Sequence, residues 1–229
     1  MLFRSIVSAL GFGGVIFTPI ARALIKNAGE LQTFMWLGII FIVISVIGSL
    51  FIKNPPKGFI PKGFDMDSIA KKNGTNCFTS REMLKTPQFY LVAFTFLLAC
   101  MAGLMMIGFT APIAIAKGLS PEVAATGVMI IALFNSFGRV FWGGISDKMG
   151  RRTTLLTLLI MTAVLILLVN VVNGIMLLVL IALIGFSYGG FLGVFPVITA
   201  DFWGMKNMGS NYGIILLGFG LGAIISSYI

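Results

Sequence analysis

Seven long apolar runs follow one another along this chain, at about 5–25, 33–52, 89–116, 121–144, 153–171, 174–199 and 208–229. Each is close to the length of about 20 apolar residues that a helix needs to cross a bilayer. The third, fourth and sixth are long enough to tilt or to extend past the hydrocarbon. This succession predicts an all-α membrane protein with seven transmembrane helices.

Composition supports this class and excludes others. Only 10% of the residues are charged, against about 25% in a soluble domain. The net charge of +9 does not predict a nucleic-acid partner, because the basic residues lie between apolar runs and form no solvated patch. The chain has no histidine, which excludes metal sites of the histidine type and histidine-based catalysis. We therefore expect no enzyme activity, no metal and no cofactor, and Cys77 and Cys100 predict no disulfide framework.

The distribution of lysine and arginine predicts how the chain crosses the membrane. Successive loops between the runs lie on opposite sides of the membrane in turn. The loops on one side hold only Arg22, Lys26 and Lys117. Arg139 lies inside a run and belongs to neither side. All the other lysines and arginines fall on the opposite side, which the positive-inside rule assigns to the cytoplasm. We expect a multi-pass protein of the plasma membrane, in contact with membrane lipid, whose N-terminus is cytoplasmic.

One substantial polar segment, from Lys53 to Gln88, separates two runs from the other five. Three prolines at its start, Pro55, Pro56 and Pro61, forbid a continuing helix. Thr79 and Glu82 have the spacing of a capping box. This spacing predicts a short helix that runs along the inner surface into the third run.

A short charged turn, GGISDKMGRR at 143–152, joins the fourth and fifth runs. So short a connection predicts antiparallel neighbouring helices. Asp147 can bond the N–H groups that open an adjacent helix, and Arg151 and Arg152 can pair with Asp147 or with lipid headgroups. A plain positive-inside loop would explain the arginines, but not the aspartate and the glycines at fixed offsets.

The turn resembles the inter-helix motif of the major facilitator superfamily, G-x-x-x-D-[KR]-x-G-R-[KR]. Its defined positions are matched by Gly143, Asp147, Lys148, Gly150, Arg151 and Arg152. The resemblance implies a bundle of twelve helices in two halves, with the motif between helices 8 and 9. The runs then become helices 5 to 11: residues 1–52 the last two helices of the N-terminal half, 53–88 the central cytoplasmic loop, and 89–229 helices 7 to 11.

The closer resemblance is to the oxalate/formate antiporter family, and it covers essentially the whole chain. The segments that carry it are GFGGVIFTPIARALI, KNPPKGF, FNSFGRVFWGGISDKMGRR and GFSYGGFLGVFPVITADFWGMKNMGSNYG. The resemblance implies a secondary transporter, antiporter or proton symporter, that moves small carboxylates by alternating access. Helices 1–4 and 12 of that family are absent, so we expect a truncated chain that does not transport alone, and a monomer when full length.

Arg139 is the candidate substrate residue. It precedes Asp147 by eight residues, which places it roughly 12 Å into the membrane. An arginine there costs about 2.5–3.5 kcal/mol on insertion scales, so it should face a cavity or a partner. The planar guanidinium suits a carboxylate substrate. Asn135, one turn deeper on the same face, could contact the substrate or orient Arg139, and polar packing between helices explains it nearly as well. A polar structural network or a misplaced helix boundary is the alternative.

Tyr188, which precedes Gly189 and Gly190, is a second candidate, because aromatic lining suits a small planar carboxylate. Ordinary aromatic packing explains it equally well. Oxalate-type members of the family carry a second cation, a lysine in helix 11, whose place falls on Phe219 here. One cation suits a monoanion, so the sequence favours a monocarboxylate such as formate, pyruvate or lactate.

Three other functions stay open at this point. The chain could be a non-functional transporter fragment, since it begins and ends close to apolar runs. It could be a seven-helix receptor or retinal protein, but the N-terminus would then lie outside, and the last run has no lysine for a Schiff base. A membrane-embedded enzyme lacks both histidine and a mid-membrane carboxylate pair for acid–base chemistry.

Overall fold

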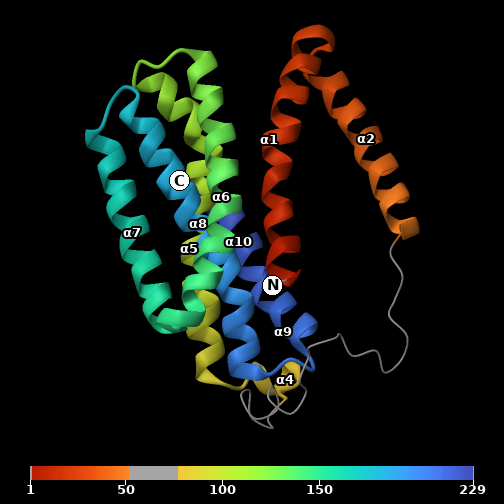
Figure 1. Ribbon diagram of the computed structural model, residues 1–229, viewed down its shortest axis with the longest axis vertical. Coiled ribbons are helices and arrows are strands. Elements are labelled where there is room, and N and C mark those ends of the chain that lie inside the picture. Colours follow the sequence, from red (N-terminus) through yellow and green to blue (C-terminus); the bar gives the residue numbers. More distant parts are fainter. Residues whose placement is uncertain (1, 52–76, 229) are drawn as a thin grey trace. The chain divides into compact units, whose positions relative to one another are not determined.

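The computed structural model describes residues 2–51 and 77–228, without the side chains of residues 2–12, 14 and 15, and the described chain is helical throughout its regular elements. The first helices are α1 (Leu2–Ala28) and α2 (Glu30–Phe51). A short α4 (Ser80–Met83) precedes α5 (Pro87–Ala116), α6 (Pro121–Met149), α7 (Arg151–Val171), α8 (Met176–Trp203), α9 (Met208–Ile215) and α10 (Leu217–Ser226) (Figure 1).

Six of the described helical stretches are long and apolar enough to cross a membrane. They are α2, α5, α6, α7, α8 and the stretch Met208–Ser226, which contains α9 and α10. α1 is a helix of 27 residues and coincides with the first predicted run, but it is not among the six. The prediction of an all-α membrane protein is confirmed.

The chain divides into two compact parts, residues 16–72 and residues 1–15 with 73–229. In the first part, α1 turns into α2 at Gly29, whose φ of 80° suits glycine because it has no Cβ atom. The N–H of Gly29 bonds the carbonyl of Ile25 at 3.0 Å. The rings of Phe17 and Phe41 pack edge to face at 4.7 Å, so one aromatic pair connects the two helices.

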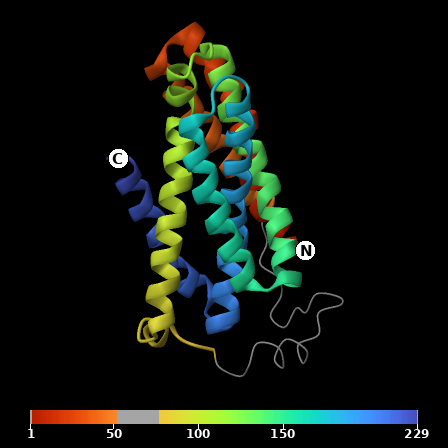
Figure 2. The ribbon, with the colours of Figure 1, turned by 90° about the vertical axis from the view of Figure 1, so that its left-hand side faces the viewer.

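The second part is a bundle in which α8 is the central helix (Figures 1 and 2). In its most apolar stretch, α8 has 67% of its residues buried, twice the share of α5 or α6. α6 and α7 are separated by Gly150 alone, whose φ is 85°. We call the end of the bundle that holds this turn, α4 and the α8–α9 turn the basic end.

Helices α6 and α8 pack along a seam of glycines. Gly185, Gly189 and Gly193 of α8 lie against the main chain of Ile131, Asn135 and Arg139 of α6, respectively. The offset is the same at all three contacts, so the helices run in the same direction and in fixed register. Small residues at this spacing let helix backbones approach closely in lipid. Gly189 and Gly190, which follow Tyr188, leave room for α6 and for the side chain of Leu158 in α7.

Two predicted elements differ in detail. The last run is not one helix, since α9 ends at Ile215 and α10 begins at Leu217. The helix before the third run has only four residues, and the turn at Leu84–Thr86 separates it from α5. Its capping box is confirmed: the N–H of Thr79 donates to Glu82 Oε2 at 2.7 Å, and the N–H of Glu82 donates to Thr79 Oγ1 at 3.4 Å.

The charge on Glu82 is stabilised by this cap. Hydrogen bonds from the N–H and then the hydroxyl of Thr79 lower the pKa of the Glu82 carboxyl below its ordinary value. Pro55, Pro56 and Pro61 of the predicted central loop lie outside the described residues. The described cysteines are free, with Cys77 exposed and Cys100 buried.

Candidate functional site

Arg139 lies in the interior of α6 and is partly buried. Its Nε donates a hydrogen bond to Oδ1 of Asn135 at 3.0 Å. Asn135 is 4% exposed, so the amide holds one side of the guanidinium from within the bundle. The expectation that the two residues share a helical face is met, and Asn135 orients Arg139. The guanidinium is planar and carries five N–H donors in all, the geometry that suits a planar carboxylate.

Tyr188 of α8 is close enough to Arg139 to interact with it electrostatically. Its side chain is 3% exposed, and its ring packs against Gly103 of α5, where a Cβ atom would clash with the ring. The hydroxyl is buried and makes no hydrogen bond with any part of the chain that the structure describes. The ring therefore packs, as one interpretation of Tyr188 expects, while the hydroxyl has unused bonding capacity and its contact with substrate stays a prediction. A buried group in this condition costs free energy unless something satisfies it.

Tyr212 of α9 is a further candidate site residue, which the sequence did not reveal. It interacts electrostatically with Arg139, and its ring lies 6.5 Å from that of Phe96 in α5. Tyr212 and Phe219 both pack against the apolar cluster that contains Tyr188. Nothing in the local sequence separates Tyr212 from any other aromatic residue of an apolar run, because its proximity to Arg139 depends on contacts between distant segments.

Trp142 follows Arg139 by one turn of α6. The sequence favours an interfacial or packing role for it, and the structure places it in the core, with its ring 5.9 Å from that of Phe186. Its indole Nε1 is buried without a hydrogen-bond partner among the described residues.

The charged turn is organised by Arg151. Its Nη1 bonds Ser146 Oγ at 2.6 Å and Asp147 Oδ1 at 2.7 Å, and its Nε bonds Asp201 Oδ2 at 2.9 Å. The predicted pairing of Arg151 with Asp147 is thus present. Asp201, near the end of α8, was not predicted to take part, and its contact ties α6, α7 and α8 together at the basic end.

The other motif residues have simpler surroundings. Gly143 is buried in α6 and its carbonyl accepts from Ser146. Gly150 supplies the positive φ of the turn. Lys148 and Arg152 are exposed, in positions from which long cationic side chains reach an aqueous or headgroup region. The described residues hold no cluster of three or more Cys, Asp or Glu that could bind a metal ion.

The sequence was compared with known families and proteins. The profile of the Major Facilitator Superfamily matches residues 5–227. The chain belongs to this superfamily. The matched residues contain the helical bundle and its charged turn. The chain is therefore a member of a transporter family.

Relatives within the superfamily are known by name. The chain is 32% identical to an uncharacterized MFS-type transporter, YhjX, of Escherichia coli over 95% of its length, and this match covers 53% of the relative. It is 30% identical to an oxalate:formate antiporter of Oxalobacter formigenes over 96% of its length, which covers 54% of the antiporter. An Aspergillus flavus MFS transporter, asaE, is 24% identical over 98% of the chain and 49% of the relative. The chain spans about half the length of these curated relatives.

Proposed function

We propose that this chain supplies one half of the substrate site of a secondary transporter for small monocarboxylates. Arg139, Asn135 and Tyr188 would bind the carboxylate near the middle of the membrane, and the helices missing from this chain would supply the rest of the site. Alternating exposure of that site to the two sides would move the anion. The same three residues would bind the carboxylate in an antiporter, which exchanges one anion for another, and in a proton symporter.

The single observation that carries this proposal is the buried hydroxyl of Tyr188, which interacts electrostatically with the Arg139 side chain. It has no hydrogen-bond partner in the described chain, and it can donate to an acceptor. The Arg139 side chain carries the charge that such an acceptor would need, and the Asn135 amide orients it. A cation and a hydroxyl donor that converge in a poorly hydrated site bind a carboxylate through charge-assisted hydrogen bonds.

The charge count favours a monoanion. The stretch from Met208 to Ile229 contains no charged residue, and Phe219, at the place of the family's second cation, packs in the apolar cluster near Tyr188. A dicarboxylate in this half-site would have one carboxylate against apolar side chains, which costs several kcal/mol for an unpaired charge. Formate, lactate or pyruvate leaves no such charge unpaired.

The charged turn would act in the conformational change rather than in binding. Arg151 joins three helices at the basic end, and its two carboxylate partners are exposed to solvent, which makes each ion pair weak enough to break and form again. The excess of Lys and Arg at this end supports an orientation in which it faces the cytoplasm at the plasma membrane, by the positive-inside rule. Residues 1–52 and 89–229 then belong to the N-terminal and C-terminal halves, joined by a cytoplasmic loop.

The test uses membrane vesicles from cells that express the natural gene, including whatever sequence flanks this chain. Uptake of labelled formate and lactate should exceed that of oxalate. Arg139→Gln should lower uptake roughly 10- to 100-fold, the effect of losing a charged hydrogen bond, with an unchanged amount of protein in the membrane. Arg139→Lys keeps the charge but loses the planar guanidinium, and should fall between. Uptake that Arg139→Gln leaves unchanged would refute the proposal.

A further inference from the structure

Residues 77–86, which we call the strap, cross the basic end of the bundle and bind the α8–α9 turn. Both main-chain groups of Phe78 are used. Its N–H donates to the carbonyl of Trp203 at 3.0 Å, and its carbonyl accepts from Nδ2 of Asn207 at 3.0 Å and of Asn211 at 3.1 Å. Two side-chain amides on one carbonyl fix the position of the strap more firmly than apolar contact would.

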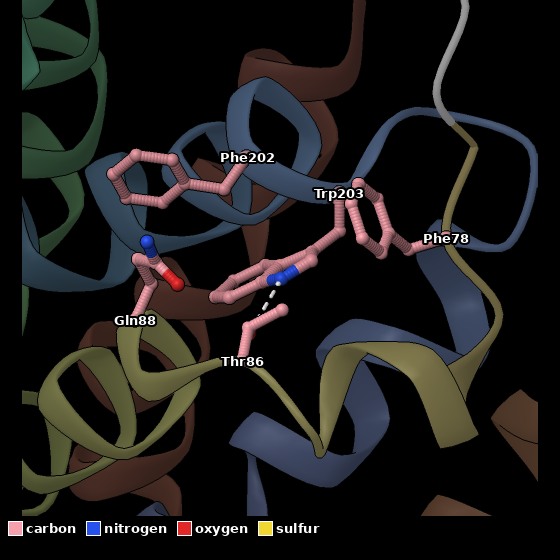
Figure 3. A pocket seen from close by; sticks show the side chains of 5 residues that line it. All are labelled: Phe78, Thr86, Gln88, Phe202 and Trp203. Atoms are coloured by element: carbon pink, nitrogen blue, oxygen red, sulfur yellow. Dashed lines mark hydrogen bonds between the residues drawn. The ribbon is translucent and has the colours of Figure 1, made fainter.

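Side chains of the strap add to this attachment. Ser80 Oγ donates to Oδ1 of Asn211 at 2.9 Å, so both ends of the Asn211 amide bond the strap, and Asn211 is fully buried. Trp203 Nε1 donates to Thr86 Oγ1 at 3.2 Å (Figure 3). Met83 is 0% exposed, so α4 seats one apolar side chain in the core. The strap is therefore part of the folded bundle and not a loose connection.

The strap contacts one particular piece of the bundle, the hairpin of residues 197–215. This piece lies between two weak points in the helices. Pro196 lies inside α8, where a proline removes a helical hydrogen bond. At its other end, the helix is interrupted at Leu216. The hairpin also carries Tyr212, whose hydroxyl group interacts electrostatically with Arg139.

The joint between strap and hairpin is not tightly packed. A cavity of about 280 Å³ lies there, lined by Phe78, Thr86, Gln88, Phe202 and Trp203 (Figure 3). Phe202 is 54% exposed. Separating two surfaces beside a cavity forfeits fewer contacts than opening a close-packed core. The attachment thus relies on the hydrogen bonds of Phe78, Ser80 and Thr86, which can be exchanged for bonds to water.

We propose that the strap is a latch for this hairpin, and that the transport cycle requires the strap to leave it. With the strap seated, the hairpin is held at its tip and Tyr212 stays beside Arg139. With the strap released, the hairpin can bend at Pro196 and Leu216 and open a path from Arg139 to the basic end. This inference rests on the proposed transport function, and it adds residues that no part of the substrate site contains.

A reversible cross-link tests the latch. Ser80→Cys and Asn211→Cys place two thiols where the oxygens are 2.9 Å apart, in a Cys77→Ser background. In vesicles from cells that express the natural gene, oxidation should reduce formate uptake below a tenth of the reduced value, and a reductant should restore it. Either single cysteine variant should keep its uptake on oxidation. An oxidised, fully cross-linked protein that transports as fast as the reduced one would overturn the latch.

If neither the parent protein nor any variant transports formate, that result overturns the proposed function and not the latch. A second measurement, which needs no transport, then tests the latch by itself. Met83→Cys, with Cys77→Ser, reports on seating, because a buried thiol reacts with a water-soluble maleimide only when the strap leaves. Asn207→Ala removes one of the two amides on Phe78 and should raise the alkylation rate about fivefold, the usual effect of one hydrogen bond. Asn173→Ala, at the other end of the bundle, should not change it. Equal rates with and without Asn207→Ala would contradict the latch.

Discussion

Gly189 lies against the main-chain oxygen of Asn135 so closely that a Cβ atom has no room between them. The contact is one of three in which α8 glycines meet α6 main chain, with Gly185 and Gly193 on either side. Tyr188 and Asn135 thus belong to the two helices that approach most closely, and the seam sets where the Tyr188 hydroxyl and the Arg139 side chain lie. The positions of the candidate substrate residues follow from glycines that touch no substrate.

Gly189→Ala should therefore destabilise the bundle. The added methyl group must push α6 and α8 apart, and overpacking of this kind costs about 1–3 kcal/mol. Thermal unfolding in detergent, followed by the exposure of buried cysteine, should show a lower Tm. Gly108→Ala is the matched control, because a Cβ atom there meets nothing within 4 Å and alanine favours a helix over glycine by about 1 kcal/mol. An unchanged Tm for Gly189→Ala would mean that the seam can open without cost.

Tyr188→Phe separates packing from binding. Phenylalanine keeps the ring that packs against Gly103 and removes a buried hydroxyl that has no partner in the described chain. The Tm should stay the same or rise, since no internal hydrogen bond is lost. Formate affinity should fall about 5- to 10-fold, which corresponds to about 1–1.4 kcal/mol for one hydrogen bond. A fall in Tm with unchanged affinity would assign Tyr188 to packing alone.

Much of this architecture was predictable because it depends on local sequence. Apolar runs of about 20 residues predict helices in lipid, and the spacing of Thr79 and Glu82 predicts a cap between residues three positions apart. The pairing of Arg151 with Asp147 is equally local, as both belong to one short turn. Each of these features can be predicted without knowing how distant helices pack.

The rest depends on contacts between distant segments. Asp201 meets Arg151 across 50 positions of sequence, and Asn211 meets Ser80 across 131. Neither residue stands out locally. The interruption of the last run at Leu216 is hidden because the sequence on both sides is uniformly apolar. The glycines at 189 and 190 were visible, but the sequence did not identify α6 and α7 as the helices that use them.

Phe219→Lys should broaden the substrate range toward dianions. Phe219 packs in the apolar cluster that includes Tyr188, so a lysine there would place a second cation near the half-site of Arg139. Oxalate uptake into vesicles should rise relative to formate uptake, because each carboxylate then has a cation. Phe219→Met, which changes shape without charge, should leave the ratio unchanged. A ratio that Phe219→Lys does not alter would place residue 219 outside the substrate site.

Acid should loosen the strap through Glu82. Hydrogen bonds from Thr79 lower the pKa of the Glu82 carboxyl in the folded state, so the ionised form stabilises the cap. This stabilisation is fully present above the unfolded pKa of about 4.3 and is lost as the pH falls through the lower folded pKa. Hydrogen exchange of residues 78–86, corrected for the intrinsic pH dependence of exchange, should therefore accelerate below about pH 4. Glu82→Gln keeps an acceptor oxygen without a titrating charge, and its corrected exchange should not change with pH in that range. If the wild type and Glu82→Gln respond to acid alike, the carboxylate does not hold the strap.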